Sequence, residues 1–531
     1  MLLSTGAMGA ATLTSRLLGM VREMVYAHFM GTSWVASAFV LAFQIPNLFR
    51  RLLGEGALTA VFIPIFKEKE TLEGERSMWH AANAVISGLV VFTCGLVALG
   101  LLGVSLALAL GGQEHDGQTL LAARTLLMLR LLRVMMPYLL LVCLAAVFMG
   151  MLNARGHFFI PAMGATMLNV VMIASVVWLA PAMGRRPGEA RLDEQIFGLA
   201  VGVLIAGVAQ AMFQLPTLFR EGFRYRWVTP WQDETVRRVV RQMLPAVIGV
   251  AAFQINVVLT LGLSFWVEDY IVASFQYAVR LLELPQGVFG ISLATYLLPT
   301  LSGLAAEKNY DQFRSEVAQG MGYLVFINLL ASVLLLTLAE PILRLLFERG
   351  AFDSASTDQA TLALTCLAPS LVFYSLVNVL ARAFYALGDT TTPMRISVFC
   401  LALNLVLVAA VVGRFKQGGL GAANTVTSMV NVALLFYALR RKLAKLEVTE
   451  LRRTLFSMLG AALMSGLAAW LGWRWWAANL GHATLGLRLG EVFLPLILAT
   501  LIYFGLATWL KVGYAKDILA LAAARLRRAK T

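Results

Sequence analysis

The sequence predicts an all-α integral membrane protein with fourteen transmembrane helices, and three observations support this prediction. Apolar residues make up 59% of the 531 residues and charged residues only 14%, whereas a soluble globular chain is about 45–50% apolar and about 25% charged. Apolar stretches of roughly 20 residues, the length that crosses a bilayer, recur between polar loops along the whole chain. Two distant parts of the chain also share a spacing of proline and glycine, which predicts two related halves.

The apolar stretches follow one another from the first residues to the basic tail. They lie at residues 2–30, 33–66, 79–104, 124–153, 158–181, 195–219, 238–264, 270–302, 317–339, 360–388, 393–413, 420–440, 453–475 and 490–512. The chain opens without the basic region and small-residue cleavage site of a signal peptide, so we expect the first stretch to remain as a transmembrane helix. An even number of spans places both ends of the chain on one side of the membrane.

The distribution of basic residues predicts the orientation. Most Lys and Arg residues of the loops fall on one side of the predicted topology, together with the C-terminal tail, and cytoplasmic loops carry such an excess. We therefore expect a multi-pass protein with both termini in the cytoplasm. The net charge of +14 is spread over these short loops and the tail, where anionic headgroups attract it, so membrane lipids rather than nucleic acid are the predicted partners.

The duplication rests on a repeated spacing of proline and glycine. Pro137 is followed by Gly156 and, 24 residues after the first proline, by Pro161; Pro369 is followed by Gly388 and Pro393 at the same intervals. A looser repeat relates the second and eighth stretches through Pro46 and Pro64, and Pro285 and Pro299. If the first six stretches repeat as the next six, two six-helix lobes share one orientation and are related by a pseudo-two-fold axis along the membrane normal.

These repeats predict three parts of the chain. We expect an N-lobe at residues 1–225, a C-lobe at 226–445, and a C-terminal helix pair with a basic cytoplasmic tail at 446–531. Such a protein usually binds its substrate between the lobes, where interrupted helices expose backbone groups. Pro46, which precedes Asn47, and Pro285 are the expected interruptions and hinges, because proline removes a backbone donor and clashes with the preceding turn. An ordinary packing kink is the alternative at either proline.

Arginine is in excess over acidic residues at apparent membrane depth. The arginines are Arg16, Arg22, Arg50, Arg51, Arg280 and Arg382, and the acids are Glu23, Glu55 and Glu283. An arginine at this depth costs roughly 2.5–3.5 kcal/mol on the lenient insertion scale and normally faces a cavity or a partner. Positive charge remains even if every acid is paired, which predicts an anionic substrate. Phosphate suits arginine, because the planar guanidinium donates two parallel hydrogen bonds to it.

The spacing of these charges leaves several roles open. Arg16 and Arg22 are six residues apart, which on a straight helix leaves them about 120° from facing the same way. Gly19 lies between them and is an expected hinge, because a bend or unwinding there lets both point inward. Arg280 and Glu283 share one helix face at i,i+3 spacing, so they either serve the substrate or simply pair with each other.

The remaining arginines at membrane depth lie near helix ends. Arg50 and Arg51 either face the cavity or act as anchors that extend to the headgroups at the cytoplasmic end of their helix. For Arg382, near the cytoplasmic end of the tenth stretch, we expect anchoring.

Nothing in the sequence indicates covalent chemistry. The five histidines lie apart, the four cysteines are scattered singly through apolar segments, and neither set has metal-ligand spacing. No GxxxxGK[ST] loop for ATP occurs. We therefore predict no enzymatic activity, no cofactor and no metal site, and expect transport to be driven by an ion gradient, the membrane potential or the substrate gradient.

Several motifs resemble one known family. The run SRLLGMVREMVYAHFMG, followed by AFQIPNLFRRLLGEGALTAVFIPIF, is highly specific to the MurJ/MviN family of bacterial lipid II flippases, within the multidrug/oligosaccharidyl-lipid/polysaccharide exporter superfamily. YAVRLLELPQGVFGISLATYLLPTLS, LLFERGAFD and ARAFYALGDTTTP add support. The resemblance covers essentially the whole chain. It implies two lobes and a final helix pair that forms a groove for a polyprenyl tail.

The resemblance also implies a substrate and the residues that bind it. The substrate is lipid II, the undecaprenyl-pyrophosphate-linked disaccharide pentapeptide, moved from the cytoplasmic to the periplasmic leaflet of the bacterial inner membrane for peptidoglycan synthesis. The cavity arginines of the family match Arg16, Arg22, Arg50 and Arg280, with Ser15, Asn47, Arg51, Glu55 and Glu283 at other positions of the same motifs. Cell-wall synthesis proteins are candidate partners.

The chain departs from the family pattern at several positions. Members commonly carry an aspartate at Ser37, sometimes a lysine at Gln44, and often an acid at Val279, so the cavity here is expected to be more positive. Some relatives bind sodium through the seventh and eleventh helices. In this chain the seventh helix offers Asn256 and Thr260 but no acid, and the eleventh offers Asn404. No sodium site is therefore predicted.

We therefore expect alternating access by rocking of two lobes, with the arginines binding the pyrophosphate while the lipid tail stays in the membrane. One alternative is a transporter of another polyprenyl-linked oligosaccharide, or a cation-coupled drug exporter, although such exporters usually need an acid at membrane depth. A different alternative is a non-transporting scaffold for cell-wall enzymes that docks them on residues 440–453. The scaffold predicts that cavity substitutions are tolerated.

Overall fold

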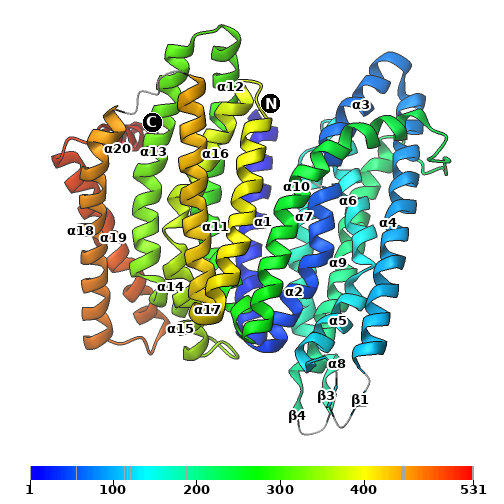
Figure 1. Ribbon diagram of the computed structural model, residues 1–531, viewed down its shortest axis with the longest axis horizontal. Helices are drawn as coiled ribbons and strands as arrows, with labels where there is room; N and C mark the ends of the chain where they lie inside the picture. The colour runs from blue at the N-terminus through cyan, green and yellow to red at the C-terminus, as the bar shows by residue number, and fades with distance from the viewer. Residues whose placement is uncertain are drawn as a thin grey trace. The chain divides into compact units, whose positions relative to one another are not determined.

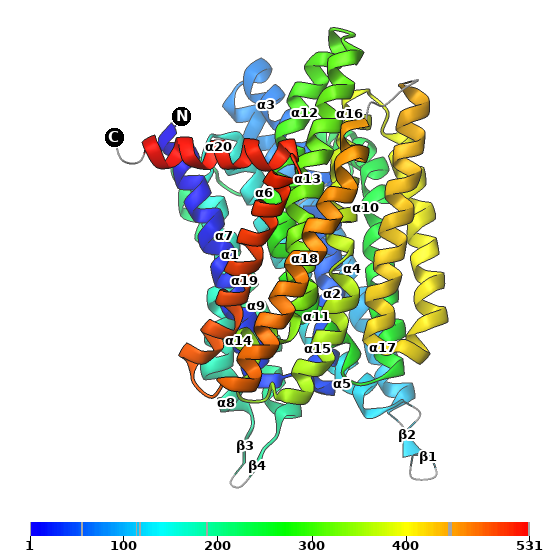
Figure 2. The same cartoon turned by 90° about the vertical axis from the view of Figure 1, so that its left-hand side faces the viewer.

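The structure of the protein is a computed structural model that describes residues 2–54, 57–112, 114–115, 118–119, 121–186, 189–443 and 449–528. Nearly all of these residues are helical, which confirms the predicted all-α class. The chain forms two compact units, Met1–Ala273 and Ser274–Thr531. Each unit is a bundle of long helices joined by short connections (Figures 1 and 2).

The first unit combines long helices with two very short hairpins. Its helices are α1 (Leu2–Met30), α2 (Trp34–Phe49), α3 (Ala57–Glu73), α4 (Glu75–Gly111), α5 (Ala123–Met135), α6 (Tyr138–Ala154), α7 (Phe159–Ala174), α8 (Ala180–Met183), α9 (Leu192–Arg220) and α10 (Glu234–Val267), with π-helical turns η1 (Arg50–Gly54) and η2 (Ser175–Leu179). The antiparallel hairpins pair β1 (Glu114–His115) with β2 (Gln118–Thr119), and β3 (Arg185–Arg186) with β4 (Glu189–Ala190). The hairpins lie at one end of this unit and α3 at the other (Figures 1 and 2).

The second unit begins within α11 and ends in a helix that the sequence did not predict. Its elements are α11 (Ile271–Pro285), η3 (Gln286–Ile291), α12 (Ser292–Ala306), α13 (Tyr310–Thr337), α14 (Ala339–Phe347), α15 (Ser354–Leu367), α16 (Ser370–Ala386), α17 (Thr391–Lys442), α18 (Thr449–Asn479), α19 (Leu485–Trp509) and α20 (Gly513–Arg528). α17 is two helices that meet at Lys416, where φ is 50° and ψ −131°, as the separate eleventh and twelfth stretches predict. α20 runs crosswise to α18 and α19 (Figure 2). Tyr514 and Ala515 anchor it in a buried cluster with Val325 and Phe326 of α13.

The second and eighth predicted stretches are each interrupted in the middle. α2 passes into η1 four residues after Pro46, and α11 passes into η3 directly after Pro285. Proline disturbs the regular hydrogen bonding of an α-helix, and π-helical turns are short and frequent at functional sites. Both units therefore contain the same order of α-helix, π-helical turn and α-helix, next to the two prolines that predicted an interruption.

The stronger repeat of the sequence is reproduced in the backbone. α5 and α6 are bent by 45° at Pro137, and α15 and α16 by 45° at Pro369. α6 and α16 end near Gly156 and Gly388, whose φ angles are +85° and +72°. In both places the glycine N–H donates to the carbonyl three residues back, and the next N–H donates to the carbonyl five residues back. This is the Schellman motif, and its left-handed position favours glycine.

Seven helices of the described chain are long and apolar enough to cross a membrane, or nine if each bent pair is one span. The interrupted second and eighth stretches are not among these spans, because each of their α-helical parts has fewer than 18 residues. The total of fourteen stays a prediction. The lobe boundaries at 225/226 and 445/446 stay predictions too, and α10 packs against α2, α3 and α4 within the first compact unit.

An ion-pair network joins the connections at the α3 end of the first unit. Arg155, just after α6, donates to Glu70, to Glu75 at 3.0 Å and to Glu221 at 2.8 Å. His157 lies 2.8 Å from the other Glu221 oxygen. The hydrogen bonds from His157 and Arg155 hold the pKa of the Glu221 carboxyl below its usual value. The network links α3, α4 and the residues that follow α6 and α9.

In the second unit, Asp389 follows the repeated glycine and joins the two ends of α17. Lys442 donates to the carboxylate of Asp389 at 2.6 Å, and the backbone N–H of Thr392 donates to it at 3.0 Å. These bonds lower the pKa of Asp389 from its ordinary value of 3.8 to about 2. A group whose pKa is lowered by folding adds stability above its ordinary pKa, and this stability is lost as the pH falls through the folded-state pKa.

We therefore expect the stabilising effect of Asp389 to be constant above about pH 5 and to disappear between about pH 4 and pH 2. This stabilising effect is measured as the difference in thermal unfolding midpoint between the parent protein and the Asp389→Asn variant, both in detergent. A difference that does not change over this pH range would contradict the prediction.

Candidate functional site

Arg22 of α1 is held by three neighbouring groups. Its Nη1 donates to Asn169 Oδ1 at 2.9 Å, and its Nη2 donates to Glu23 Oε1 at 2.5 Å. Its guanidinium carbon lies 5.5 Å from the centroid of the Tyr26 ring. Only 12% of the Arg22 side chain and 8% of the Glu23 side chain are exposed, so removing either charge would leave the other poorly compensated. Arg22 Nε is buried and makes no hydrogen bond within the described part of the chain.

Asn169 of α7 is a site residue that the sequence analysis missed. Its Oδ1 accepts the hydrogen bond from Arg22, and its Nδ2 donates to the backbone carbonyl of Ser15 at 3.1 Å. The residue is 7% exposed. It therefore links two turns of α1 to α7 and fixes the direction of the Arg22 side chain. A polar amide inside an apolar stretch is uncommon at membrane depth, and that signal could have identified it.

α1 is neither bent nor unwound at Gly19, because it is unbroken from Leu2 to Met30, and the role of Gly19 as a hinge stays a prediction. Gly19 instead faces Asn169, and a Cβ atom there would lie 3.8 Å from Asn169 Nδ2. The glycine thus sits where α1 meets the polar link to α7. A distance of 3.8 Å is an ordinary van der Waals contact, so the position leaves room for a methyl group.

Arg16 differs from Arg22 in its surroundings. The Arg16 side chain is exposed, and it makes no ion pair or hydrogen bond to any part of the chain that the structure describes. Because α1 continues without a break, the two arginines keep the angular separation that a straight helix gives. The structure therefore provides one fixed guanidinium and one open guanidinium on the same helix.

Asn47 and Arg50 meet where α2 passes into η1. Arg50 Nε donates to Asn47 Oδ1 at 2.8 Å, and Asn47 is 8% exposed. The backbone N–H of Arg50 donates to the carbonyls of Pro46 and Asn47. Pro46 is buried and Arg51 is partly buried, while Glu55 lies outside the described residues. The change of helix type thus places an arginine side chain directly beside the interruption.

Arg280 of α11 is paired on its own helix in the second unit. Its Nη1 donates to Glu283 Oε2 at 2.8 Å, and the two side chains are 32% and 45% exposed. The i,i+3 pair expected from the sequence therefore forms. Pro285 follows within one turn, at the junction with η3. Arg50 is thus the first residue of η1 in the first unit, and Arg280 lies within about two turns of η3 in the second unit.

Ser37 of α2 is a second residue with a role that the sequence did not reveal. Its side chain is fully buried, and its Oγ accepts a hydrogen bond from the backbone N–H of Ala273 at 3.3 Å. Ala273 lies in the first turn of α11, where backbone N–H groups lack partners within the helix. Ser37 therefore caps the start of α11 from another helix. At this position, where the resemblance suggests aspartate, a neutral hydroxyl meets the N–H group.

A metal site needs several ligand side chains that converge on one point. Within the described ranges, no group of three or more His, Cys, Asp or Glu side chains is placed to hold a metal ion. Asn404, considered above for sodium, is buried and donates to Thr427 Oγ1 at 3.5 Å. These are amide and hydroxyl groups, and neither supplies the carboxylate charge that protein cation sites usually have.

Comparison with known protein sequences gives a consistent result. Residues 26–487 match the family model described as "Lipid II flippase MurJ". A "Probable lipid II flippase MurJ" of Vibrio cholerae is 32% identical, and the match covers 87% of this chain and 89% of the relative. The protein of the same description from Bdellovibrio bacteriovorus is also 32% identical, over 94% of this chain and 93% of the relative. Arg50 and Arg280 lie within the matched family range, and Arg16 and Arg22 precede it.

Solved structures with the same fold include two transporters. "Lipid II flippase MurJ, inward closed conformation" has a TM-score of 0.77 at 20% identity and covers 96% of this chain and 99% of that chain. The inward-facing structure of "a multidrug resistance MATE family transporter of the MOP superfamily" has a TM-score of 0.66 at 14% identity, over 81% of this chain and 94% of that chain. At these identities the likeness shows the fold alone.

The link through Asn169 predicts a measurable loss of stability. Asn169→Ala removes the acceptor for Arg22 and leaves the Ser15 carbonyl without this donor, which should cost about 1–3 kcal/mol. The unfolding midpoint in detergent measures the loss. Asn169→Asp is the matched variant: it keeps an acceptor for Arg22, loses the donor to Ser15 and adds a carboxylate that can pair with the Arg22 guanidinium, so its loss should be smaller. Equal midpoints for Asn169→Ala and the parent protein would refute the role of this link.

The geometry at Gly19 predicts that a small side chain is tolerated. Gly19→Ala should fit and should stabilise α1 by about 0.5–1 kcal/mol, because alanine restricts the unfolded chain and favours helix. Gly202→Ala is the matched control, since a Cβ there would lie 2.2 Å from Ser175 Oγ and must displace it. Thermal unfolding and transport of both variants test this. Loss of transport in Gly19→Ala with an unchanged unfolding midpoint would instead support a hinge.

Proposed function

The chain belongs to the lipid II flippase MurJ family, and from this premise we propose that it moves lipid II from the cytoplasmic to the periplasmic leaflet of the bacterial inner membrane. The disaccharide pentapeptide and the pyrophosphate cross inside the protein, while the undecaprenyl tail stays among the lipids. In this proposal both termini lie in the cytoplasm, which is the orientation that the distribution of Lys and Arg predicts.

The proposal rests on the guanidinium groups that the apolar helices carry. Arg22 has Glu23 as a counter-ion and Arg280 has Glu283, whereas Arg16 has no ion pair among the residues described. A charged arginine at membrane depth is costly unless water or a partner compensates it. A pyrophosphate is an anionic partner of the right kind, because guanidinium groups bind phosphate oxygens through paired hydrogen bonds.

The two Arg–Glu pairs suggest how the site is stable both with and without substrate. In the empty state, Glu23 and Glu283 neutralise Arg22 and Arg280. When lipid II enters, its pyrophosphate replaces these carboxylates as counter-ion, and the carboxylates return when the substrate leaves. The exchange keeps each arginine compensated throughout the cycle, and it avoids the large cost of taking a pyrophosphate out of water without opposite charge.

We further propose that the site is a water-filled cavity that opens to each side of the membrane in turn by alternating access. Its pyrophosphate-binding residues are Arg16, Arg22, Arg50 and Arg280, supported by Ser15, Asn47, Arg51, Glu55 and Glu283. The π-helical turns η1 and η3 are the proposed points of bending, next to Pro46 and Pro285. A π-helical turn carries backbone groups outside the regular α-helical ladder, so its geometry can change with less loss of hydrogen bonding.

Arg22→Ala and Arg280→Ala should each abolish growth in cells depleted of their own flippase. Loss of one charge-assisted interaction of about 1.5–3 kcal/mol lowers substrate binding by about 10- to 100-fold. The direct measurement is the amount of lipid II that an external reagent can reach on such cells. Arg191→Ala is the control, because Arg191 is exposed and its ion pairs with the described residues are to neighbouring Asp193 and Glu194.

Immunoblotting of membranes and the unfolding midpoint show whether each variant is inserted and folded. Full growth and normal lipid II exposure with both Arg22→Ala and Arg280→Ala would contradict the proposed mechanism. Binding of the purified protein to lipid II, compared with a polyprenyl-linked O-antigen precursor, separates lipid II transport from transport of another oligosaccharide.

A further inference from the structure

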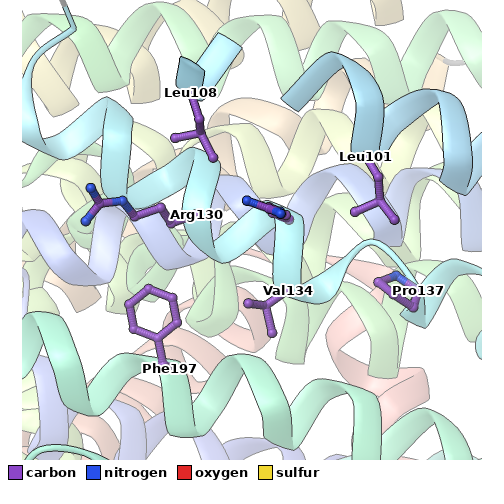
Figure 3. Close-up of a pocket in the computed structure, with 7 residues that line it drawn as sticks. Leu101, Leu108, Arg130, Val134, Pro137 and Phe197 are labelled. Carbon is purple, nitrogen blue, oxygen red and sulfur yellow. The ribbon is translucent and has the colours of Figure 1, made fainter. Parts of the chain in front are cut away.

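A groove on the first unit lies apart from the residues proposed to bind the pyrophosphate. It has a volume of about 430 Å³ and opens at the surface between α4, α5 and α9. Leu101 and Leu108 of α4, Phe197 of α9 and Pro137 contribute apolar walls (Figure 3). Arg130 of α5 lies beside them. The groove is thus a mostly apolar trough with positive charge along one side.

The positive charge comes from two arginines on one face of α5. Arg130 and Arg133 are spaced i,i+3, both line the groove and both are exposed. Neither makes an ion pair or hydrogen bond within the part of the chain that the structure describes. The acids at the start of neighbouring α9, Asp193 and Glu194, are paired with Arg191 instead. The groove therefore presents two guanidinium groups and no lining carboxylate.

The surroundings place the groove at the boundary between lipid chains and headgroups. α4 exposes Leu102 by 68% and Leu106 by 61%, and a face this apolar is suited to lipid chains rather than water. α9 opens with the charged residues Asp193 and Glu194, one turn before Phe197. Charged residues collect at the headgroup level of a membrane helix, so Phe197 and the groove lie just inside that level.

We propose that this groove binds an anionic glycerophospholipid, with the phosphodiester held by Arg130 and Arg133 and the acyl chains lying on Leu101, Leu108 and Phe197. Guanidinium groups hold phosphate through paired hydrogen bonds, and a volume of about 430 Å³ is in the range of small-molecule sites. The charge selects an anionic headgroup over a zwitterionic one. The proposal does not depend on the transported substrate.

The site has a structural consequence, because Pro137 lines the groove. Pro137 is the point where α5 and α6 bend by 45°. A lipid seated here contacts α4, α5 and α9 together and stabilises the bent arrangement. The content of anionic lipid in the membrane therefore tunes the stability of the first unit.

The test uses the full-length protein with palmitoyl-oleoyl phosphatidylglycerol and the phosphatidylcholine of the same chains as the probes. Native mass spectrometry counts the lipid retained by each variant, and the unfolding midpoint is measured with each lipid. We expect the parent protein to prefer phosphatidylglycerol by at least about tenfold, which corresponds to about 1.4 kcal/mol. The double variant Arg130→Gln/Arg133→Gln should lose both the preference and the lipid-dependent rise in midpoint.

Two further variants make the result decisive. Arg191→Gln, which removes an arginine already paired on the same end of the unit, should keep the preference. Leu108→Trp keeps both arginines and fills the groove, so it should also lose retained phosphatidylglycerol, and it serves as the test if the double variant does not fold. An unchanged preference in the double variant and in Leu108→Trp, or equal retention of the two lipids by the parent protein, would overturn the proposal.

Discussion

Placing guanidinium groups among apolar helices carries a free-energy cost, and the side chains around Arg22 and Arg280 compensate it. An uncompensated arginine at membrane depth would destabilise its helix by several kcal/mol. The first unit meets this cost for Arg22 with a carboxylate, an amide and an aromatic ring. The second unit meets it for Arg280 with Glu283, one turn along the same helix. The carboxylate partners, Glu23 and Glu283, lie on the same helix as their arginine, whereas Asn169 reaches Arg22 from α7.

The helices near these arginines are irregular, and Pro46 and Pro285 lie beside the irregular turns. Asn47 and Arg50 lie at the junction of α2 and η1, and Arg280 lies shortly before the junction of α11 and η3. Inside a regular helix every backbone N–H and C=O group is hydrogen-bonded within the helix, so only side chains are left to bind a ligand. A π-helical turn beside a charged side chain gives both a polar contact and a place where the helix can bend. The same arrangement occurs in both units, in α2 with η1 and in α11 with η3.

Much of the fold follows from local patterns that a sequence displays directly. The first stretch coincides with α1, and the proline and glycine repeat marks two equal bends and two left-handed helix ends. Prolines also locate the interruptions of α2 and α11. α20 escaped prediction because its helix is short, carries many charges and is held by tertiary contacts of Tyr514 and Ala515.

The candidate site was predicted less completely than the fold. The Arg280–Glu283 pair was foreseen as one alternative, because i,i+3 spacing is visible in the sequence. Asn169 was missed, and Ser37 was noted only as a departure from the family pattern, since their partners Arg22 and Ala273 lie 147 and 236 residues away. Gly19, a predicted hinge, faces Asn169 in an unbroken helix, and its role as a hinge stays a prediction. Contacts between residues this far apart in the sequence depend on how the helices pack. The spacing of residues along one helix does not predict that packing.

A structure of the protein with lipid II bound would show whether a diphosphate replaces carboxylates as the counter-ion of these arginines. We expect phosphate oxygens at about 3 Å from the guanidinium nitrogens of Arg22 and Arg280, with Glu23 and Glu283 no longer in contact with them. A bound lipid II whose diphosphate lies elsewhere, with both arginine–glutamate pairs intact, would rule out this exchange.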